Sequence, residues 1–278
     1  MTRPGLLAAA LLLVVGCAGG PQPRPDAALL RKQVAQALIA KRNWAGVTRP
    51  LQRLAADRPG DPDLHAMLGT VYREQGLHDE AEAAFQTALQ LDPRHAEAWN
   101  GLGMLRDVRH DAGDGAVEAF RKAIAIAPNH PTYYNNLGVA LFRRGQDLPA
   151  LEAFRKGLQR DPGVRRIRNN LGFTYGRLGH YQHAKREFYR AGPPGEAENN
   201  LGWVYELGGD PETACTCYRE AARLEPTLVV VQSNLTRACA AAAAIERERG
   251  GVETAQLPVP PPKAASVTPR VAAKRRMP

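Results

Sequence analysis

Four short stretches of the sequence place asparagine directly before leucine. "NNLG" spans Asn135–Gly138, Asn169–Gly172 and Asn199–Gly202, and the related "SNLT" spans Ser233–Thr236. An asparagine amide carries one acceptor and two donors, so a row of amides can pair with both the C=O and the N–H groups of an extended peptide. Such a row would hold a peptide backbone without reading its side chains. It requires a structural unit that repeats at a constant spacing.

The histidines form no catalytic or metal-binding pattern. His180 and His183 would share a helix face, but they lie near a predicted turn, and no H-E-x-x-H spacing occurs. The sequence also lacks a G-x-S-x-G motif, a P-loop and a dinucleotide-binding fingerprint. It therefore predicts a protein that is not an enzyme and that uses no cofactor and no metal.

Glycines and aromatic residues recur together along most of the chain. Five of the glycines that follow a leucine are 34 or 35 residues apart, except for a last interval of 30: Gly69, Gly103, Gly138, Gly172 and Gly202. About sixteen residues after each comes an aromatic residue within an Ala-x₃-aromatic-x₂-Ala pattern, with glycine for the last alanine in one copy. These spacings put small and aromatic residues on one helix face, where two helices can approach closely. Prolines between the repeats end the second helices.

These motifs resemble the tetratricopeptide repeat, a helix-turn-helix unit of 34 residues with the pattern W-x₂-L-G-x₂-Y, A-x₃-F and a closing proline. The resemblance implies an all-α fold: a right-handed α-solenoid of about six helix pairs followed by a C-terminal capping helix. The solenoid is expected over 28–249, with repeats 28–61, 62–95, 96–130, 131–164, 165–194 and 195–228 and a cap helix at 229–249. The fifth repeat has lost four residues, and "GPPGE" replaces its closing turn.

In this repeat family the first helix of each pair lines a concave groove, through positions two, five, six, nine, twelve and thirteen of the repeat. By this resemblance the groove holds a row of asparagines: Asn135, Asn136, Asn169, Asn170, Asn199, Asn200 and Asn234. The repeats of O-linked N-acetylglucosamine transferase show a similar asparagine ladder. The alternative is that each amide only bonds the next helix, which is common in these repeats.

Other groove positions add apolar surface and positive charge. The apolar residues are Met104, Phe142, Phe173 and Trp203, and the basic residues are Arg143, Arg166 and Arg177. Arg165 and Arg168 enlarge the basic cluster in "VRRIRNN". A basic groove suggests an acidic peptide or a C-terminal carboxylate as its ligand. The alternative for each arginine is a solvated charged face.

The start of the chain predicts export and lipidation. Residues 1–16 hold one basic residue, an apolar run and small residues, and the run is shorter than the roughly 20 residues of a membrane-spanning helix. "VVGC" resembles the lipobox of bacterial lipoproteins, which implies that Cys17 carries a diacylglycerol thioether and an acylated amino group. Ala18 follows instead of Asp, which by resemblance to Gram-negative lipoproteins favours the outer membrane. The alternative is an ordinary secretory signal with an incidental cysteine.

The flanking segments and the other cysteines complete the expected organisation. Residues 17–27 would be a flexible tether, and residues 250–278 a disordered, Pro-rich basic tail that could rest on anionic lipid or cell-wall polymer. Cys215, Cys217 and Cys239 fit small buried core residues, and an exported chain leaves room for one disulfide among them.

Taken together, these features predict a non-enzymatic lipoprotein of the bacterial outer membrane that faces the periplasm and binds extended segments of envelope proteins. The net charge of +9 does not indicate nucleic acid as a partner, because an exported lipoprotein does not meet it. The lipobox, the repeats and "RAGPPGEAENNLGWVYE" resemble the tetratricopeptide lipoprotein of tight-adherence (Tad/Flp) pilus assembly. The alternatives are a pilotin for a type IV pilus secretin and an adaptor that docks cell-wall hydrolases or a periplasmic protease.

Overall fold

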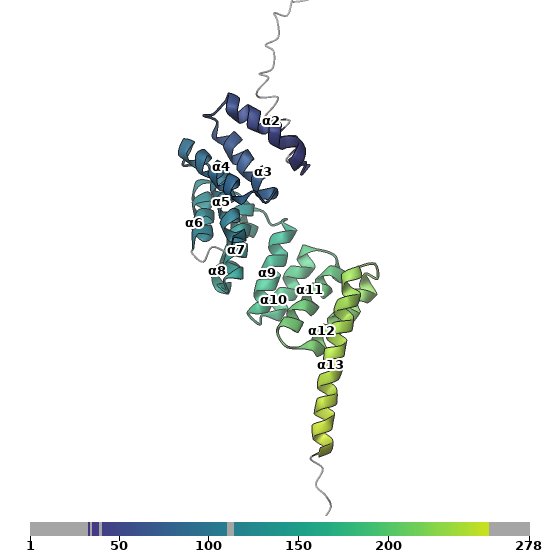
Figure 1. Ribbon diagram of the computed structural model, residues 1–278. Coiled ribbons are helices and arrows are strands. Elements are labelled where there is room, and N and C mark those ends of the chain that lie inside the picture. Colours follow the sequence, from purple (N-terminus) through teal and green to yellow (C-terminus); the bar gives the residue numbers. More distant parts are fainter. Residues whose placement is uncertain (1–32, 34, 39–40, 110–113, 256–278) are drawn as a thin grey trace, which may run out of the picture. The chain divides into compact units, whose positions relative to one another are not determined.

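The computed structural model describes residues 33, 35–38, 41–109 and 114–255 (Figure 1). Every regular element within these residues is a helix, which confirms the predicted all-α fold. Cys17, the predicted signal peptide and tether, and the tail beyond Ala255 lie outside the described residues. The chain divides into two compact units, Met1–Ala140 and Leu141–Pro278.

The first unit contains helix pairs, and capping residues in the sequence mark where helices begin. Its helices are α2 (Trp44–Asp57), α3 (Pro62–Glu74), α4 (His78–Leu91), α5 (Ala96–Val108), α6 (Gly115–Ile126) and most of α7 (Pro131–Arg143). The Asp61 carboxylate accepts from the backbone N–H of Asp63 at the start of α3, where Pro62 occupies the first turn. The pairs α3/α4 and α5/α6 each pack together, and their helices lie within residues 62–95 and 96–130 respectively.

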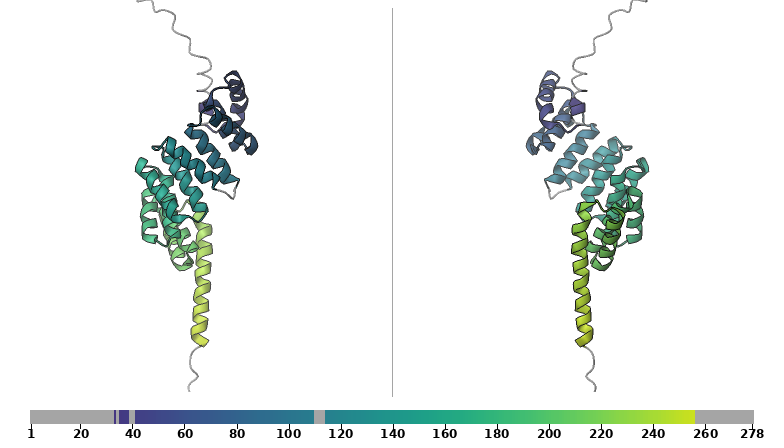
Figure 2. Two further views of the ribbon diagram at one scale, coloured as in Figure 1. Left: turned by 90° about the vertical axis from the view of Figure 1, so that its left-hand side faces the viewer. Right: turned by 90° about the vertical axis from the view of Figure 1, so that its right-hand side faces the viewer.

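The second unit continues the series and ends in a long helix. Its helices are α8 (Asp147–Arg160), α9 (Arg165–Arg177), α10 (Tyr181–Ala191), α11 (Pro194–Leu207), α12 (Pro211–Leu224) and α13 (Val229–Ala255). At 11 residues, α10 is shorter than α8 and α12, which have 14 each, so the loss in the fifth repeat shortens its second helix. The end of α13 extends beyond α12 (Figure 2) and passes residue 249, the expected end of the cap.

A glycine of the first helix lies against an aromatic ring of the second helix in four repeats. The pairs are Gly69 with Phe85, Gly103 with Phe120, Gly172 with Phe188, and Gly202 with Tyr218. A Cβ atom on any of these glycines would lie 2.5–2.8 Å from a ring carbon, and all four rings are at most 1% exposed. Close helix packing therefore requires glycine at this position. The spacing of glycines and aromatic residues in the sequence arises from this contact.

Three interactions tie α13 to the helices before it. A disulfide joins Cys215 of α12 to Cys239 of α13, with the Cα atoms 4.8 Å apart. Arg237 of α13 forms an ion pair with Glu206 of α11, with Nε 2.6 Å from Oε1, and its guanidinium holds the pKa of Glu206 below the usual 4.5. The third interaction is a hydrogen bond that Asn234 Nδ2 of α13 donates to Asn199 Oδ1 of α11, at 3.0 Å. Cys217 remains a buried free thiol, and burial raises its pKa to about 12.

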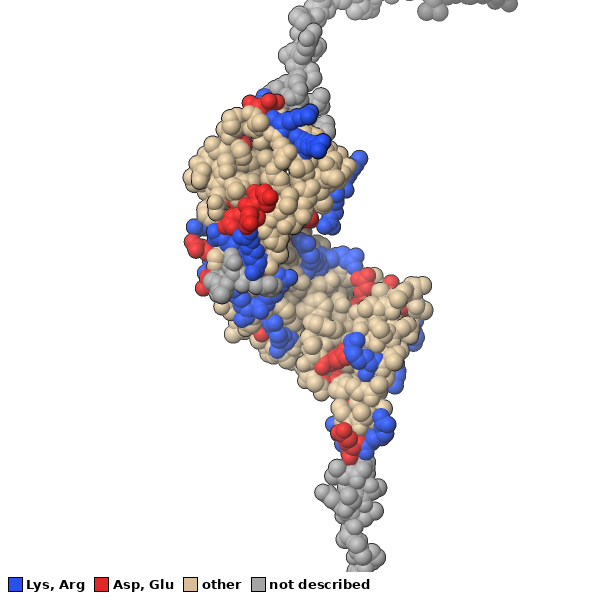
Figure 3. Space-filling model, viewed as in Figure 1, with Lys and Arg blue, Asp and Glu red and all other residues tan. Residues whose placement is uncertain are grey.

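The surface carries side chains of both charges (Figure 3). None of the helices in the described part of the chain has the length and apolar character needed to cross a membrane.

Candidate functional site

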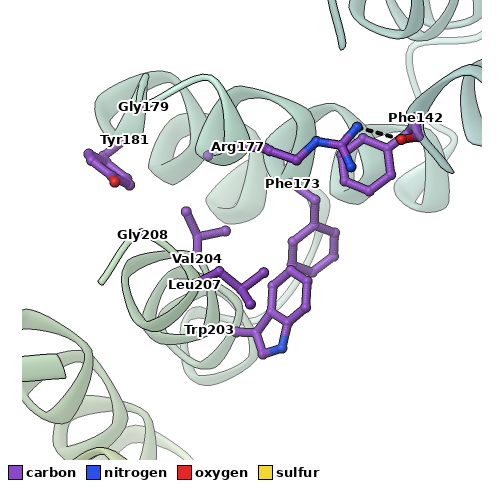
Figure 4. Close-up of a pocket in the computed structure, with 10 residues that line it drawn as sticks. Phe142, Phe173, Arg177, Gly179, Tyr181, Trp203, Val204, Leu207 and Gly208 are labelled. Carbon is purple, nitrogen blue, oxygen red and sulfur yellow. Dashed lines mark hydrogen bonds between the residues drawn. The ribbon is translucent and has the colours of Figure 1, made fainter. Parts of the chain in front are cut away.

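The second unit contains a pocket of about 390 Å³ whose walls come mainly from α9 and α11. Its walls include Phe173 on α9, Tyr181 at the start of α10, and Trp203 and Leu207 on α11, with Phe142 contributed by the end of α7 (Figure 4). Mostly apolar walls with a few polar groups are typical of ligand pockets.

Two aromatic rings form one wall of the pocket. Phe173 and Trp203 meet edge to face, with ring centroids 5.1 Å apart and an angle of 81° between the rings. Phe173 also packs against the buried ring of Phe188, at 4.9 Å between centroids, so the wall is anchored in the core. Trp203 is 39% exposed and Leu207 is 66% exposed. Large apolar side chains that remain exposed beside a pocket mark a surface suited to binding.

Glycines let the two helices approach at the pocket. A Cβ atom on Gly176 would lie 2.2 Å from Cγ1 of Val204, and one on Gly208 would lie 2.3 Å from the Tyr181 hydroxyl. Gly176 and Leu207 were not singled out in the sequence, although they occupy groove-facing positions twelve and thirteen of their repeats. These groove-facing repeat positions are the sequence signal by which both residues could have been predicted. Tyr181, on a second helix, carried no such signal.

Arg177 belongs to the pocket wall as part of an internal ion pair. Its Nε lies 2.6 Å from Asp147 Oδ1, and one terminal nitrogen donates to the Phe142 carbonyl oxygen at 2.5 Å. The guanidinium also lies over the Phe142 ring, 3.4 Å from its centroid (Figure 4). Asp147 offsets the charge that the sequence suggested for ligand binding. Arg177 therefore fixes Phe142 in place.

The basic cluster at the start of α9 is partly neutralised within the fold. Arg165 pairs with Glu196 and Arg168 with Glu187, each at 3.0 Å. Arg166 is exposed and forms neither an ion pair nor a hydrogen bond through its side chain within the described residues. One cation of the cluster thus remains available to a ligand.

The asparagine row contains amide-to-amide bonds between neighbouring helices. Asn136 Nδ2 donates to Asn100 Oδ1 at 2.9 Å in the first unit, and Asn234 Nδ2 donates to Asn199 Oδ1 at 3.0 Å in the second. Each bond joins position six of one repeat to position five of the repeat before it. For these side chains the structure supports the alternative weighed from the sequence, a tie to the next helix. We call this series of bonds the asparagine ladder.

The ladder is interrupted between α9 and α11. Asn169 and Asn200 hold the same two repeat positions as the bonded pairs, yet neither side chain makes a hydrogen bond in the part of the chain that the structure describes. Both are half-buried. They are 31 residues apart, whereas the bonded pairs are 36 and 35 apart. The unbonded pair thus coincides with the repeat whose second helix, α10, is shortened.

The remaining predicted residues do not line the pocket. Asn135 is buried and donates to Asn136 at 3.4 Å, and Asn170 is half-buried on α9. Met104 belongs to the first unit, where its sulfur accepts from Arg73 at 2.8 Å. Arg143 is exposed at the end of α7.

The described residues contain no group of three or more His, Cys, Asp or Glu side chains that could hold a metal ion. Among titratable groups near the pocket, burial raises the pKa of Tyr205, which stacks on Tyr181 with ring centroids 4.4 Å apart. The site offers shape, aromatic surface and amides. These features suit the binding of a peptide.

Models of the tetratricopeptide repeat match residues 49–96, 66–131, 108–165 and 196–228, which together make up more than half of the chain. The chain belongs to the tetratricopeptide-repeat family. Proteins of this family are generally non-enzymatic scaffolds that bind protein or peptide partners. The shortened fifth repeat falls between the matched ranges.

Several solved structures share the fold of this tetratricopeptide-repeat protein. PilW, a widely conserved type IV pilus biogenesis factor, is 20% identical, with a TM-score of 0.63 over 76% of this chain and 99% of its own. PilF of Pseudomonas aeruginosa is 18% identical, with a TM-score of 0.61 over 76% of this chain and 97% of its own. A chain of the Cut9–Hcn1 complex is 20% identical, with a TM-score of 0.62, and the match covers 76% of this chain but 42% of that one. No curated protein matches the sequence.

Proposed function

We propose that this protein is a lipid-anchored scaffold of the bacterial outer membrane that holds an extended segment of another envelope protein in the pocket of the second unit. The observation that carries the proposal is the pocket itself, which is walled by Phe173 and Trp203 and bordered by the exposed Leu207. A fold that packs its core well and still exposes these side chains together is suited to a partner that covers them.

Two features support a location in the cell envelope. The "VVGC" sequence before and at Cys17 resembles a lipobox, and two or more acyl chains hold a protein on a bilayer far better than one. The disulfide between Cys215 and Cys239 fits an oxidising compartment such as the periplasm, because disulfides are rare in reducing compartments.

Assembly of a Tad/Flp-type pilus or a related secretion apparatus is the role that we favour. The support is the sequence resemblance around "GPPGEAENNLGWVYE" together with the fold shared with PilW and PilF. A pilotin for a type IV pilus secretin is the second candidate, because PilW is described as a type IV pilus biogenesis factor. Docking of a cell-wall hydrolase or a protease is the adaptor alternative.

The pocket can be tested by cross-linking in the bacterium that makes the protein. A photo-reactive residue at Leu207 should cross-link to a pilus or secretion component, and Phe173→Ala with Trp203→Ala should remove that product. Leu148→Ala is the matched control, because Leu148 is 68% exposed on α8 and does not line the pocket. An undiminished product from the double variant would contradict the pocket as the binding site. A hydrolase or protease as the product would favour the adaptor.

The anchor is tested separately. Cys17→Ser should abolish labelling by radioactive palmitate and leave the protein unprocessed or soluble, since the thioether and the new amino group both depend on Cys17. Labelling that persists in Cys17→Ser would contradict the lipid anchor.

A further inference from the structure

We infer that the interruption of the asparagine ladder is a recognition site for an extended acidic peptide that inserts an aromatic side chain into the adjoining pocket. The inference rests on the proposed binding function and specifies its ligand. Three observations on α9 and α11 carry it: two amides that have no hydrogen-bond partner among the described residues, an aromatic pocket beside them, and an exposed cation on the same helix face.

The two amides of the interruption retain their hydrogen-bonding capacity. Elsewhere this pair of repeat positions is joined directly, as Asn234 is to Asn199 at 3.0 Å. Asn169 and Asn200 are half-buried without such a bond in the described structure. A hydrogen bond from a peptide N–H or C=O contributes more binding free energy at an unpaired, partly buried amide than at a paired one. At the paired amide, an existing hydrogen bond between side chains must first be broken. Two amides on neighbouring helices can therefore hold the backbone of an extended strand.

The amides lie one helical turn from the pocket wall. Asn169 precedes Phe173 by four residues on α9, and Asn200 precedes Trp203 by three on α11. Residues at these spacings are neighbours on one helix face. Phe173 and Trp203 in turn contact each other across the two helices, with ring centroids 5.1 Å apart. A backbone bound at the amides would thus present a side chain to the pocket.

The pocket suits an aromatic side chain. Its volume of about 390 Å³ accommodates a large side chain, and the Trp203 ring is 39% exposed at its wall. A third ring would meet Phe173 and Trp203 in the offset or edge-on arrangements that aromatic groups prefer, each such pair adding stabilisation beyond simple burial.

The charge of the surrounding helices selects an acidic peptide. Helix α9 carries four arginines and no acidic residue, and the three glutamates of α11 are already engaged: Glu196 by Arg165, Glu198 by the Tyr189 hydroxyl and Glu206 by Arg237. Arg166 is exposed, has no partner within the described residues, and lies three residues before Asn169 and seven before Phe173 on α9. Seven residues of helix rise about 10.5 Å, which an extended chain covers in about three residues. We therefore expect an acidic residue about three positions from the aromatic residue.

The test uses purified full-length protein in detergent and fluorescent Gly/Ser peptides that carry one Phe, one Glu three positions away in either order, and an amidated C-terminus. The parent peptide should bind, and replacing its Phe by Ala should weaken binding at least about tenfold. Replacing its Glu by Lys should weaken binding to the wild type, and Arg166→Glu should reverse that preference. Equal affinity for the Phe and Ala peptides would overturn the aromatic assignment.

The amides are tested with a matched pair of variants. Asn169→Ala with Asn200→Ala should weaken binding of the parent peptide about five- to a hundredfold, the loss expected for two hydrogen bonds, with the melting temperature unchanged. Asn136→Ala, which removes a bonded amide, should lower the melting temperature and leave peptide affinity intact. Unchanged affinity in the double variant would overturn the inference.

Failure of the inference is distinguishable from failure of the proposed function. If cross-linking at Leu207 still depends on Phe173 and Trp203 but no peptide of this class binds, the pocket holds a partner of different chemistry. If neither cross-linking nor peptide binding depends on them, both proposals are wrong.

Discussion

Gly172→Leu is expected to unfold a large part of the second unit. A Cβ atom at residue 172 would lie 2.5 Å from Phe188, whose ring is 1% exposed and cannot move away without disturbing its neighbours. Overpacking of a core typically costs 1–3 kcal/mol, and a leucine here should reach or pass the upper end. Because Phe188 also contacts Phe173, the pocket wall should be lost together with the fold. Thermal unfolding followed by circular dichroism measures the effect.

A control and a double-mutant cycle make this expectation specific. Gly60→Leu introduces the same side chain where a Cβ atom would have nothing within 4 Å, so the melting temperature should barely change. Gly172→Ala should be less destabilising in the presence of Phe188→Leu than alone, because a smaller side chain relieves the clash. A melting curve of Gly172→Leu that matches the wild type would show that these helices do not pack in this way.

The helix pairs could be predicted from the sequence because their contacts are local. Gly172 and Phe188 are only sixteen residues apart, and the requirement for a small residue beneath a ring recurs in each repeat, so periodicity alone reveals it. The end of α13 was less predictable. The helix continues past Gly250 and Gly251 to Ala255, and the first proline that could stop it is Pro258.

Which asparagine amides form hydrogen bonds with one another could not be predicted, because these bonds depend on how adjacent repeats pack. Asn136 and Asn200 hold the same groove position in their repeats, yet within the described part of the chain Asn136 bonds a neighbouring amide and Asn200 does not. The difference coincides with the short α10, a second helix that carries none of these asparagines. Likewise, the ion pair of Arg177 with Asp147 joins residues that are 30 positions apart, so no local pattern indicated that the charge of Arg177 would be offset.

Reduction of the disulfide between Cys215 and Cys239, which are 24 residues apart, is expected to weaken the attachment of α13 by about 3.4 kcal/mol, the loop-entropy contribution for a loop of this length. The remaining contacts are the ion pair of Arg237 with Glu206 and the hydrogen bond that Asn234 Nδ2 donates to Asn199 Oδ1. We therefore expect faster amide hydrogen exchange throughout α13 in the reduced protein, with α9 and α11 still protected. Cys215→Ser with Cys239→Ser should reproduce the effect without reductant.

Lowering the pH should further weaken the attachment of α13 in the reduced protein. The pKa of Glu206 is lowered in the folded protein, mainly by Arg237, so its contribution is present above the unfolded value near 4.5 and is lost as pH falls through the folded pKa. Exchange of α13 in the reduced protein should consequently rise further between pH 7 and pH 3, after correction for the intrinsic exchange rate, and Glu206→Gln should remove most of that rise. Because Glu206 is partly solvated, we expect a contribution on the order of 1 kcal/mol. Exchange of α13 that is equal in the oxidised and reduced proteins would show that the helix is held by packing and that the disulfide adds nothing to its attachment.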